Sequence, residues 1–161
     1  MATVMEKLVI PVFRSPQEQQ EHDDAVRKLA TTRFAIPDWK IALNLGIRTN
    51  DQPDIVAVND GQVVAIGEVE TETTINREQA AHWKSMAELS PRFYLFVPEG
   101  TEELTKNLIE EYKICCAGLR SYKNFDGEMS VKSVQYDFNT EECRPDNHAW
   151  WWRIGRGRDA S

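Results

Sequence analysis

The stretch PDIVAVNDGQVVAIGEVE, residues 53–70, decides the fold that this chain can adopt. Two apolar runs, IVAV and VVAI, flank the sequence Asn59-Asp60-Gly61, which is typical of the turn of a β-hairpin. The stretch therefore predicts two antiparallel strands joined by a tight turn. It also carries three acidic residues, Asp54, Glu68 and Glu70, at the end of the hairpin away from the turn.

The segments around the hairpin alternate between helical and strand patterns. Before it, Ser15, Pro16 and Glu18 form a capping box that predicts a helix to about Thr31. Apolar and polar residues then alternate from 39 to 47, which predicts a strand with one buried face. The later predictions are a helix capped by Asn76 that ends at Ser90-Pro91, a strand at 92–97, a helix at 101–112, and strands at 114–119 and 131–138.

This order of helix, three antiparallel strands, helix, strand, helix and strand is typical of an α/β fold in which helices cover a mixed sheet. The chain has 161 residues, of which 41% are hydrophobic, and this suffices for one core. We expect a single domain over residues 1–161, with its core at about 15–122 and a C-terminal extension at 123–161.

The N-terminal sequence and the cysteines indicate the compartment in which the protein is expected. The first residues, MATVMEKLVIPVF, contain a short apolar run interrupted by Pro11, so they predict neither a signal peptide nor a membrane span. Cys115, Cys116 and Cys143 fit neither a zinc site nor an even-numbered disulfide framework. We therefore expect a cytoplasmic protein with free thiols and no membrane contact.

The formal net charge of −7 argues against avid nonspecific binding to DNA, because such binding depends on many contacts from Lys and Arg to phosphates. A local basic face is sufficient, however, and several arginines crowd the C-terminal end beside Trp150-Trp151-Trp152. These aromatic residues either stack on bases or, as we favour, pack on the core or on a second copy of the chain.

Glu68 and Glu70 are two residues apart on a predicted strand, so their side chains point to the same face. Val64 and Ile66 share that face and favour its burial. The alternative is an exposed acidic face that continues to Glu72. Burial in a structure would exclude this alternative.

The face taken by Asp54 depends on the turn. A two-residue Asp60-Gly61 turn places Asp54 on the face opposite to Glu68. A three-residue turn that also includes Asn59 pairs Asp54 with Ile66 and places it on the Glu68 face, about 7–8 Å away along a diagonal. The glycine suits the three-residue turn, which we expect.

Three carboxylates on one face repel one another, and a hard cation with oxygen ligands, Mg²⁺ or Mn²⁺, relieves that repulsion. Such a cation polarises a phosphoryl group, lowers the pKa of water and stabilises a leaving oxygen, which together promote phosphodiester hydrolysis. The histidines, His22, His82 and His148, have no metal-ligand spacing, and we expect them to be structural or solvent-facing.

Pro53-Asp54, the hairpin and Glu68-Val69-Glu70, with a helix before and helix–strand units after, resemble the PD-(D/E)XK nuclease superfamily over roughly residues 15–122. The resemblance implies a restriction endonuclease-like fold and a metal-dependent nuclease that acts on DNA. It further implies that Asp54 and Glu68 bind the metal and that the backbone carbonyl of Val69 adds a ligand. Because many such nucleases cut both strands as dimers, a homodimer is a further expectation.

The third position of the motif departs from the pattern, since the usual Lys is Glu70. In the first interpretation Glu70 is a general base or a further ligand, since a minority of restriction enzymes carry Glu at this place. Alternatively, Lys84 on the next helix replaces the missing Lys. In the third interpretation the site has lost catalysis, and the domain is a catalytically inactive module for binding or assembly.

Overall fold

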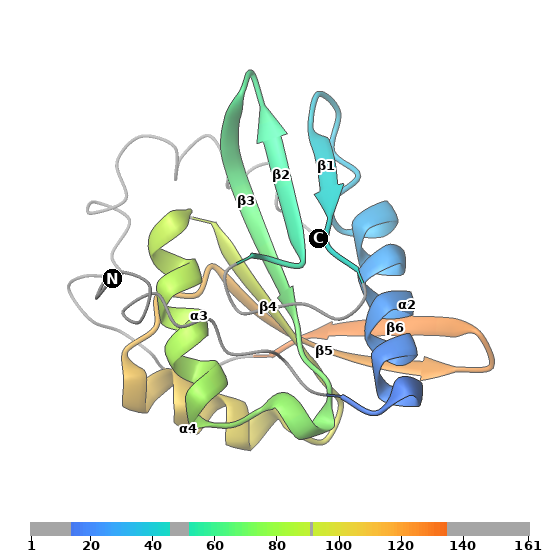
Figure 1. The fold of residues 1–161 in the computed structure, drawn as a ribbon, viewed down its shortest axis with the longest axis vertical. Helices are drawn as coiled ribbons and strands as arrows, with labels where there is room; N and C mark the ends of the chain where they lie inside the picture. Colours follow the sequence, from blue (N-terminus) through green and yellow to red (C-terminus); the bar gives the residue numbers. More distant parts are fainter. Residues whose placement is uncertain (1–13, 46–51, 91, 135–161) are drawn as a thin grey trace, which may run out of the picture.

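The computed structural model describes residues 14–45, 52–90 and 92–134 of the chain. Within these residues, helices lie beside one six-stranded sheet (Figure 1). The elements are α2 (Pro16–Thr32), β1 (Lys40–Leu43), β2 (Ile55–Asn59), β3 (Gln62–Val69), the 3₁₀-helix η1 (Glu72–Thr74), α3 (Arg77–Leu89), β4 (Phe93–Pro98), α4 (Glu102–Tyr112), β5 (Gly118–Phe125) and β6 (Glu128–Ser133).

The strands lie side by side in their chain order, from β1 to β6. β1, β2 and β3 pair antiparallel, β3, β4 and β5 pair parallel, and β5 and β6 form an antiparallel hairpin. The parallel pairs need crossovers, which α3 and α4 provide. The predicted α/β fold, a mixed sheet flanked by helices with the elements in the expected order, is therefore confirmed.

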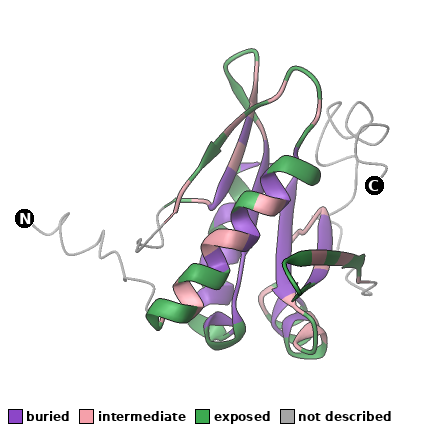
Figure 2. Cartoon of the chain, turned by 90° about the vertical axis from the view of Figure 1, so that its right-hand side faces the viewer, coloured by how far each residue is buried: buried purple, intermediate pink, exposed green. Residues whose placement is uncertain are grey.

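The sheet has a core on each face, as the alternation along β4 illustrates. Phe93, Leu95 and Val97 pack into a cluster with the apolar residues of α3 and α4. Tyr94 and Phe96 point the other way, into a cluster with α2. Buried segments accordingly concentrate in the central strands, while the hairpin tips and outer helix faces are exposed (Figure 2).

The turn between β2 and β3 is shorter than expected. Asn59 pairs with Gln62, so the loop consists of two residues, Asp60-Gly61. Both have positive φ angles, 53° and 76°, the left-handed backbone conformation that a two-residue type I′ hairpin turn requires. The expectation of a three-residue turn is therefore wrong.

A two-residue turn alone would place Asp54 on the face opposite to Glu68, but a β-bulge in β3 shifts the register by one residue and returns Asp54 to the Glu68 side. Val58 pairs with Val63 and Ala57 with Ala65, which leaves Val64 as the extra residue. Beyond the bulge the pairing continues to Ile55 and Gly67. The next residues toward the open end of the hairpin are Asp54 on one strand and Glu68 on the other, which therefore lie opposite each other. The predicted diagonal arrangement of these acids is replaced by a direct one.

Several element boundaries differ from the predictions. β1 is only Lys40–Leu43, and the predicted buried face is present in part: Trp39, Ile41 and Leu45 pack partly buried against the core cluster with α2, whereas Leu43 is exposed. β5 begins at Gly118 because α4 ends with Lys113 in the left-handed conformation, and Ile114 then packs into the core. β6 (Glu128–Ser133) lies in the predicted C-terminal extension and adds a strand to the same sheet.

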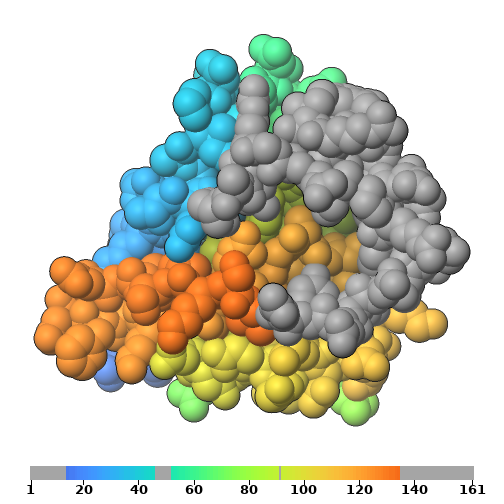
Figure 3. All heavy atoms as spheres, turned by 180° about the vertical axis from the view of Figure 1, so that it is seen from behind, coloured from blue at the N-terminus to red at the C-terminus, as the bar shows by residue number. Residues whose placement is uncertain are grey.

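The hairpin of β5 and β6 extends past the rest of the described chain (Figures 1 and 3). Cys116 is not in a disulfide, as predicted, whereas Cys115 takes part in one, so the expectation of a reduced thiol is wrong for Cys115. Among the helices described, none has the length and hydropathy that crossing a membrane requires.

Candidate functional site

The three acidic residues of the hairpin are almost completely buried. The exposed fractions of Asp54, Glu68 and Glu70 are 1%, 2% and 0%. They lie where β2 begins and β3 ends, and their contacts come from α2 on one side and α3 on the other. The alternative of an exposed acidic strand face is therefore wrong.

Asp54 and Glu68 hold each other in place through the backbone. The Asp54 N–H donates to Glu68 Oε1 at 3.0 Å, and the Val69 N–H donates to Asp54 Oδ2 at 2.7 Å. These crossed hydrogen bonds fix the two carboxylates side by side. The register set by the bulge makes them possible, because it brings the start of β2 level with the end of β3.

A histidine contacts each member of this pair. His82 of α3 has Nε2 3.2 Å from Glu68 Oε2. His22 of α2 has Nε2 3.1 Å from Asp54 Oδ1, an ion-pair distance without the alignment of a hydrogen bond, and Nδ1 2.9 Å from Asp23 Oδ1. Both histidines are buried, so the solvent-facing alternative is wrong for them, and sequence reasoning missed their contacts with the acids.

A signal for these two contacts was present in the sequence. His22 lies on the same apolar stripe of α2 as Ala25 and Val26, and His82 precedes the buried Trp83 of α3. A histidine on the stripe of a helix that packs against an acidic strand end has a carboxylate within reach. Spacing rules for metal ligands do not detect this, since the two histidines come from separate helices.

Glu70 has a different environment, which consists of side-chain donors. Thr74 Oγ1 donates to Glu70 Oε1 at 2.6 Å. Trp83 Nε1 and Gln79 Nε2 donate to Oε2 at 2.7 and 3.1 Å. These residues belong to η1 and the first turns of α3, so the donors surround the carboxylate where the chain leaves β3. We call this group the Glu70 cage.

A buried cation completes the Glu70 cage. Arg14 Nη2 lies 3.7 Å from Glu70 Oε1, its Nε donates to Thr71 Oγ1 at 2.7 Å, and its side chain is 4% exposed. Burial raises the pKa of Glu70, and the negative charge of Glu68 raises it further, while the donors and Arg14 act in the opposite direction. Both oxygens of Glu70 are thus engaged by the protein.

Lys84 does not lie with the acidic residues. Its Nζ donates to the Tyr112 carbonyl at 3.0 Å and is 3.5 Å from the Lys113 carbonyl, at the C-terminal end of α4. The residues of α3 that are buried include His82 and Trp83, whereas Lys84 lies on the exposed side. The structure therefore brings Asp54, Glu68 and Glu70 together and leaves Lys84 apart from them.

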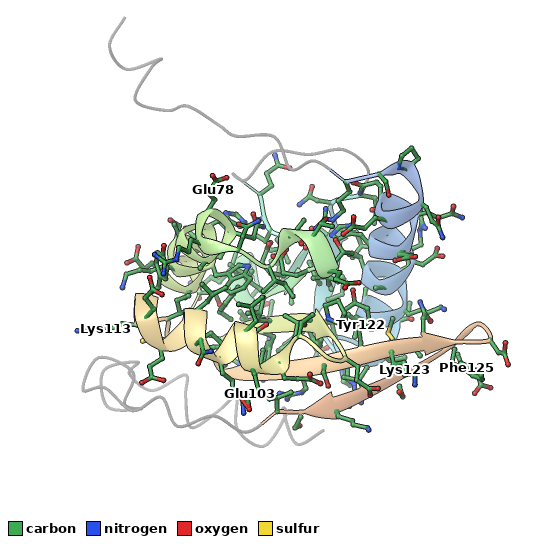
Figure 4. The ribbon with its side chains drawn as sticks, turned by 90° about the horizontal axis from the view of Figure 1, so that it is seen from below. Glu78, Glu103, Lys113, Tyr122, Lys123 and Phe125 are labelled. Atoms are coloured by element: carbon green, nitrogen blue, oxygen red, sulfur yellow. The ribbon has the colours of Figure 1, made fainter. Side chains whose placement is uncertain are left out.

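Beside the Glu70 cage, the surface has a depression of about 340 Å³. Tyr122 forms part of its wall, and its hydroxyl donates to the Glu70 carbonyl at 2.5 Å. Burial and the charge of Glu70 raise the pKa of Tyr122. Figure 4 shows Tyr122 close to the body of the molecule and Phe125 toward the tip of the β5–β6 hairpin. Glu21, Glu72, Glu99 and Lys123 also line the depression.

Candidate ligands for a metal ion are sparse in the part of the chain that the structure describes. No group of three or more His, Cys, Asp or Glu residues has that arrangement in residues 14–45, 52–90 and 92–134. The carboxylates of Asp54 and Glu68 lie side by side, and one or two carboxylates together with water are a common ligand set for Mg²⁺. His148 and Trp150-Trp151-Trp152 lie outside the described residues.

Comparison with known proteins gives a fold-level likeness. No protein-family model matches the chain, and no curated protein is similar to it. The solved structure of the YaeQ protein from Pseudomonas syringae is similar with a TM-score of 0.44 and 16% sequence identity, over 76% of this chain and 75% of that chain.

Proposed function

We propose that this chain is a metal-dependent nuclease of the PD-(D/E)XK kind, which hydrolyses phosphodiester bonds in DNA with Mg²⁺ or Mn²⁺ bound at Asp54 and Glu68. The observation that supports this most is the crossed pair of hydrogen bonds, which sets two buried carboxylates side by side at the hairpin end. Two such carboxylates repel each other, and a cation between them offsets that repulsion.

The chemistry of the donor set fits a hard cation. Both candidate ligands are carboxylates, which supply the oxygen atoms that Mg²⁺ and Mn²⁺ prefer, and two are enough for an ion that keeps several waters. When bound, such an ion polarises a phosphoryl oxygen and lowers the pKa of water. Val69 fixes Asp54 through its N–H, and the expected contribution of its carbonyl stays a prediction.

The residues considered for the third position receive different roles in this proposal. Because Glu70 accepts hydrogen bonds from three side chains and its charge faces Arg14, we assign it a structural role rather than that of a general base. Lys84 binds carbonyls at the end of α4, and we assign it the role of a helix cap. The catalytic task of the side chains is then to hold and orient the cation.

A second candidate function is a catalytically inactive domain that binds a protein or a nucleic acid. The observation that favours it is the burial of Asp54 and Glu68, whose oxygens already accept contacts from backbone N–H groups and histidines. A network that satisfies itself in this way needs no cation. Affinity for Mn²⁺ separates the two candidates, since an inactive domain need not bind the ion.

The proposal is tested by cleavage of labelled duplex, single-stranded and four-way-junction DNA in Mg²⁺ and in Mn²⁺. Wild-type protein is compared with Glu68→Gln, which keeps an oxygen for the Asp54 N–H but removes the charge that a cation needs. Glu88→Gln, an exposed carboxylate of α3, is the matched control.

We expect cleavage by the wild type and by Glu88→Gln, no cleavage by Glu68→Gln, and no cleavage in EDTA. If folded wild-type protein cuts none of the three substrates in either cation, the nuclease proposal is wrong and the inactive binding domain replaces it. Cleavage by Glu68→Gln at the wild-type rate would also contradict the proposal.

A further inference from the structure

We infer that His82 and His22 are positioning residues, one from each side of the sheet, that hold the carboxylates of Glu68 and Asp54 in the orientation for binding a cation. The inference rests on the proposed function and deepens it. It concerns the two imidazoles, which the sequence did not connect with the site and which no metal-ligand spacing would have identified.

Glu68 is fixed at both of its oxygens, and the two fixing groups differ in kind. The Asp54 N–H donates to Oε1 at 3.0 Å, and His82 Nε2 lies 3.2 Å from Oε2. The terminal torsion of a Glu side chain is broad and roughly two-fold, so one hydrogen bond places an oxygen but leaves the plane of the carboxylate loosely defined. The second contact, from His82, fixes the plane.

Asp54 has one backbone hydrogen bond and one ion-pair contact, the latter from the other helix. The Val69 N–H donates to Oδ2 at 2.7 Å, and His22 Nε2 is 3.1 Å from Oδ1. The remaining ring nitrogen of His22, Nδ1, is 2.9 Å from Asp23 Oδ1, which sets the orientation of the imidazole. In metal sites the carboxylates that bind the ion are themselves held by hydrogen-bonding partners in the outer shell.

Both histidines lie on helices that are packed into the core. His22 belongs to the buried stripe of α2, which packs into the core cluster on one face of the sheet. His82 is next to Trp83, which belongs to the core cluster on the opposite face. The exposed fractions of His22 and His82 are 0% and 8%. Side chains locked by packing hold a site more accurately than side chains on loops.

A purely structural role is the competing explanation, in which each histidine only satisfies a buried carboxylate. The two explanations predict different measurements. A structural histidine affects the melting temperature of the metal-free protein and leaves the affinity of the folded protein for a cation unchanged. A positioning histidine weakens cation binding, and a side chain that restores the hydrogen bond restores the affinity.

The test measures the dissociation constant of Mn²⁺ by electron paramagnetic resonance of the free ion, with melting temperatures recorded in EDTA. The proteins are wild type, His82→Leu, which removes the nitrogen, and His82→Gln, whose amide nitrogen can reach the position of Nε2. Ser85→Leu places the same leucine on the exposed face of α3 and is the control. His22→Leu tests the other side of the site.

We expect His82→Leu to weaken Mn²⁺ binding by about 10–100-fold, the range found when outer-shell partners are removed. His82→Gln should recover most of the affinity, and Ser85→Leu should match the wild type. If His82→Leu does not fold, His82→Asn replaces it, because the shorter amide falls short of Glu68, and the same loss is expected.

Equal Mn²⁺ affinity in His82→Leu and the wild type would overturn the inference while the proposed function stands. Failure of the wild type to bind Mn²⁺ at all would remove the proposed function and the inference with it. The two failures are distinguishable, because the first appears only in the variants and the second already appears in the unchanged protein.

Discussion

Glu68 and Glu70 are two residues apart, point to one face and are buried to 2% and 0% exposure, yet their partners differ. Glu68 faces another carboxylate, that of Asp54, with a backbone N–H and a histidine as its own contacts. Glu70 faces side-chain donors and the cation of Arg14. The spacing of two acids on a strand therefore decides their direction, while the neighbouring elements decide what each acid can do.

The physical cause of the difference is the end of β3. Glu68 lies within the strand, level with the start of β2, whereas Glu70 is the first residue after the strand. From there the chain turns into η1 and α3, which return over the carboxylate and supply Thr74 and Trp83 as donors. The environment of Glu70 is thus made by the segment that follows it in the sequence.

The largest effect on stability is expected from Glu70→Ala, which removes the centre of the Glu70 cage. The change leaves the Trp83 N–H, other donors and the Arg14 charge buried without their acceptor. Removing one partner from a buried ionic network costs about 3–5 kcal/mol. The free energy of unfolding, measured by urea denaturation in EDTA, should fall by that amount. A loss no larger than that of an exposed substitution would contradict the described cage.

Trp83→Phe should have a smaller effect, because it removes one donor and retains an aromatic ring. The indole N–H that reaches Glu70 Oε2 at 2.7 Å is lost, and the acceptor remains buried. Glu70 Oε2 keeps the donor of Gln79, so the cost is that of one lost hydrogen bond to a charged group, about 1.5–3 kcal/mol. Urea denaturation of Trp83→Phe and Glu70→Ala, separately and combined, should give a non-additive sum, whereas additive losses would show that the two residues act independently.

The dependence of stability on pH should distinguish Glu70 from Glu18, an acid whose pKa moves in the opposite direction. Burial raises the pKa of Glu70 above its usual value of 4.5. The contribution of Glu70 to the free energy of unfolding is therefore fully present below pH 4.5 and is lost as the pH rises through the raised pKa. Burial also raises the pKa of Glu18, but hydrogen bonds from Thr73 outweigh that effect and leave it below 4.5. The contribution of Glu18 to the free energy of unfolding is therefore present above pH 4.5 and is lost as the pH falls through the lowered pKa.

Urea denaturation in EDTA at several pH values checks this contrast. The difference in unfolding free energy between the wild type and Glu70→Gln should shrink as the pH rises above the usual value of 4.5. The difference between the wild type and Glu18→Gln should instead shrink as the pH falls below 4.5. Parallel profiles for the two variants would contradict the opposite pKa directions.

The smallest effect is expected from Glu72→Gln, the next acid at the same spacing. Glu72 is exposed in η1, and substitutions at exposed positions usually change stability by less than about 0.5 kcal/mol. Its urea midpoint should match that of the wild type within this limit. A fall in unfolding free energy as large as that of Trp83→Phe would mean that the exposure of Glu72 does not distinguish it from the buried Glu68 and Glu70.

Local signals explain how much of the fold was predictable. The period of two in β2 and β3, the place of the hairpin turn and the Ser15 cap are local signals, and each appears in the structure, although the turn is one residue shorter than expected. The bulge at Val64 depends on how the strands twist against their neighbours, so no local pattern indicated it. Glu18, expected to close the capping box, instead accepts hydrogen bonds from Thr73 across two elements.

The candidate site was predictable to a lesser degree. The shared face of Glu68 and Glu70 follows from strand geometry alone. The contacts of His22, His82 and Arg14 join segments that are far apart in the sequence, and only packing of α2 and α3 on the sheet brings them to the acids. The stripe of each helix places its histidine inward, but residue type and spacing do not tell which side chain the histidine meets.

The central claim is that the carboxylate pair, rather than Glu70, binds the cation, and titration with Mn²⁺ tests it most directly. The dissociation constant is measured for the wild type, Glu68→Gln, Glu70→Gln and Glu72→Gln, each shown to be folded in EDTA. We predict that binding is lost in Glu68→Gln and retained in the other three. Binding that is lost in Glu70→Gln but retained in Glu68→Gln, or absent from the wild type, would contradict the claim.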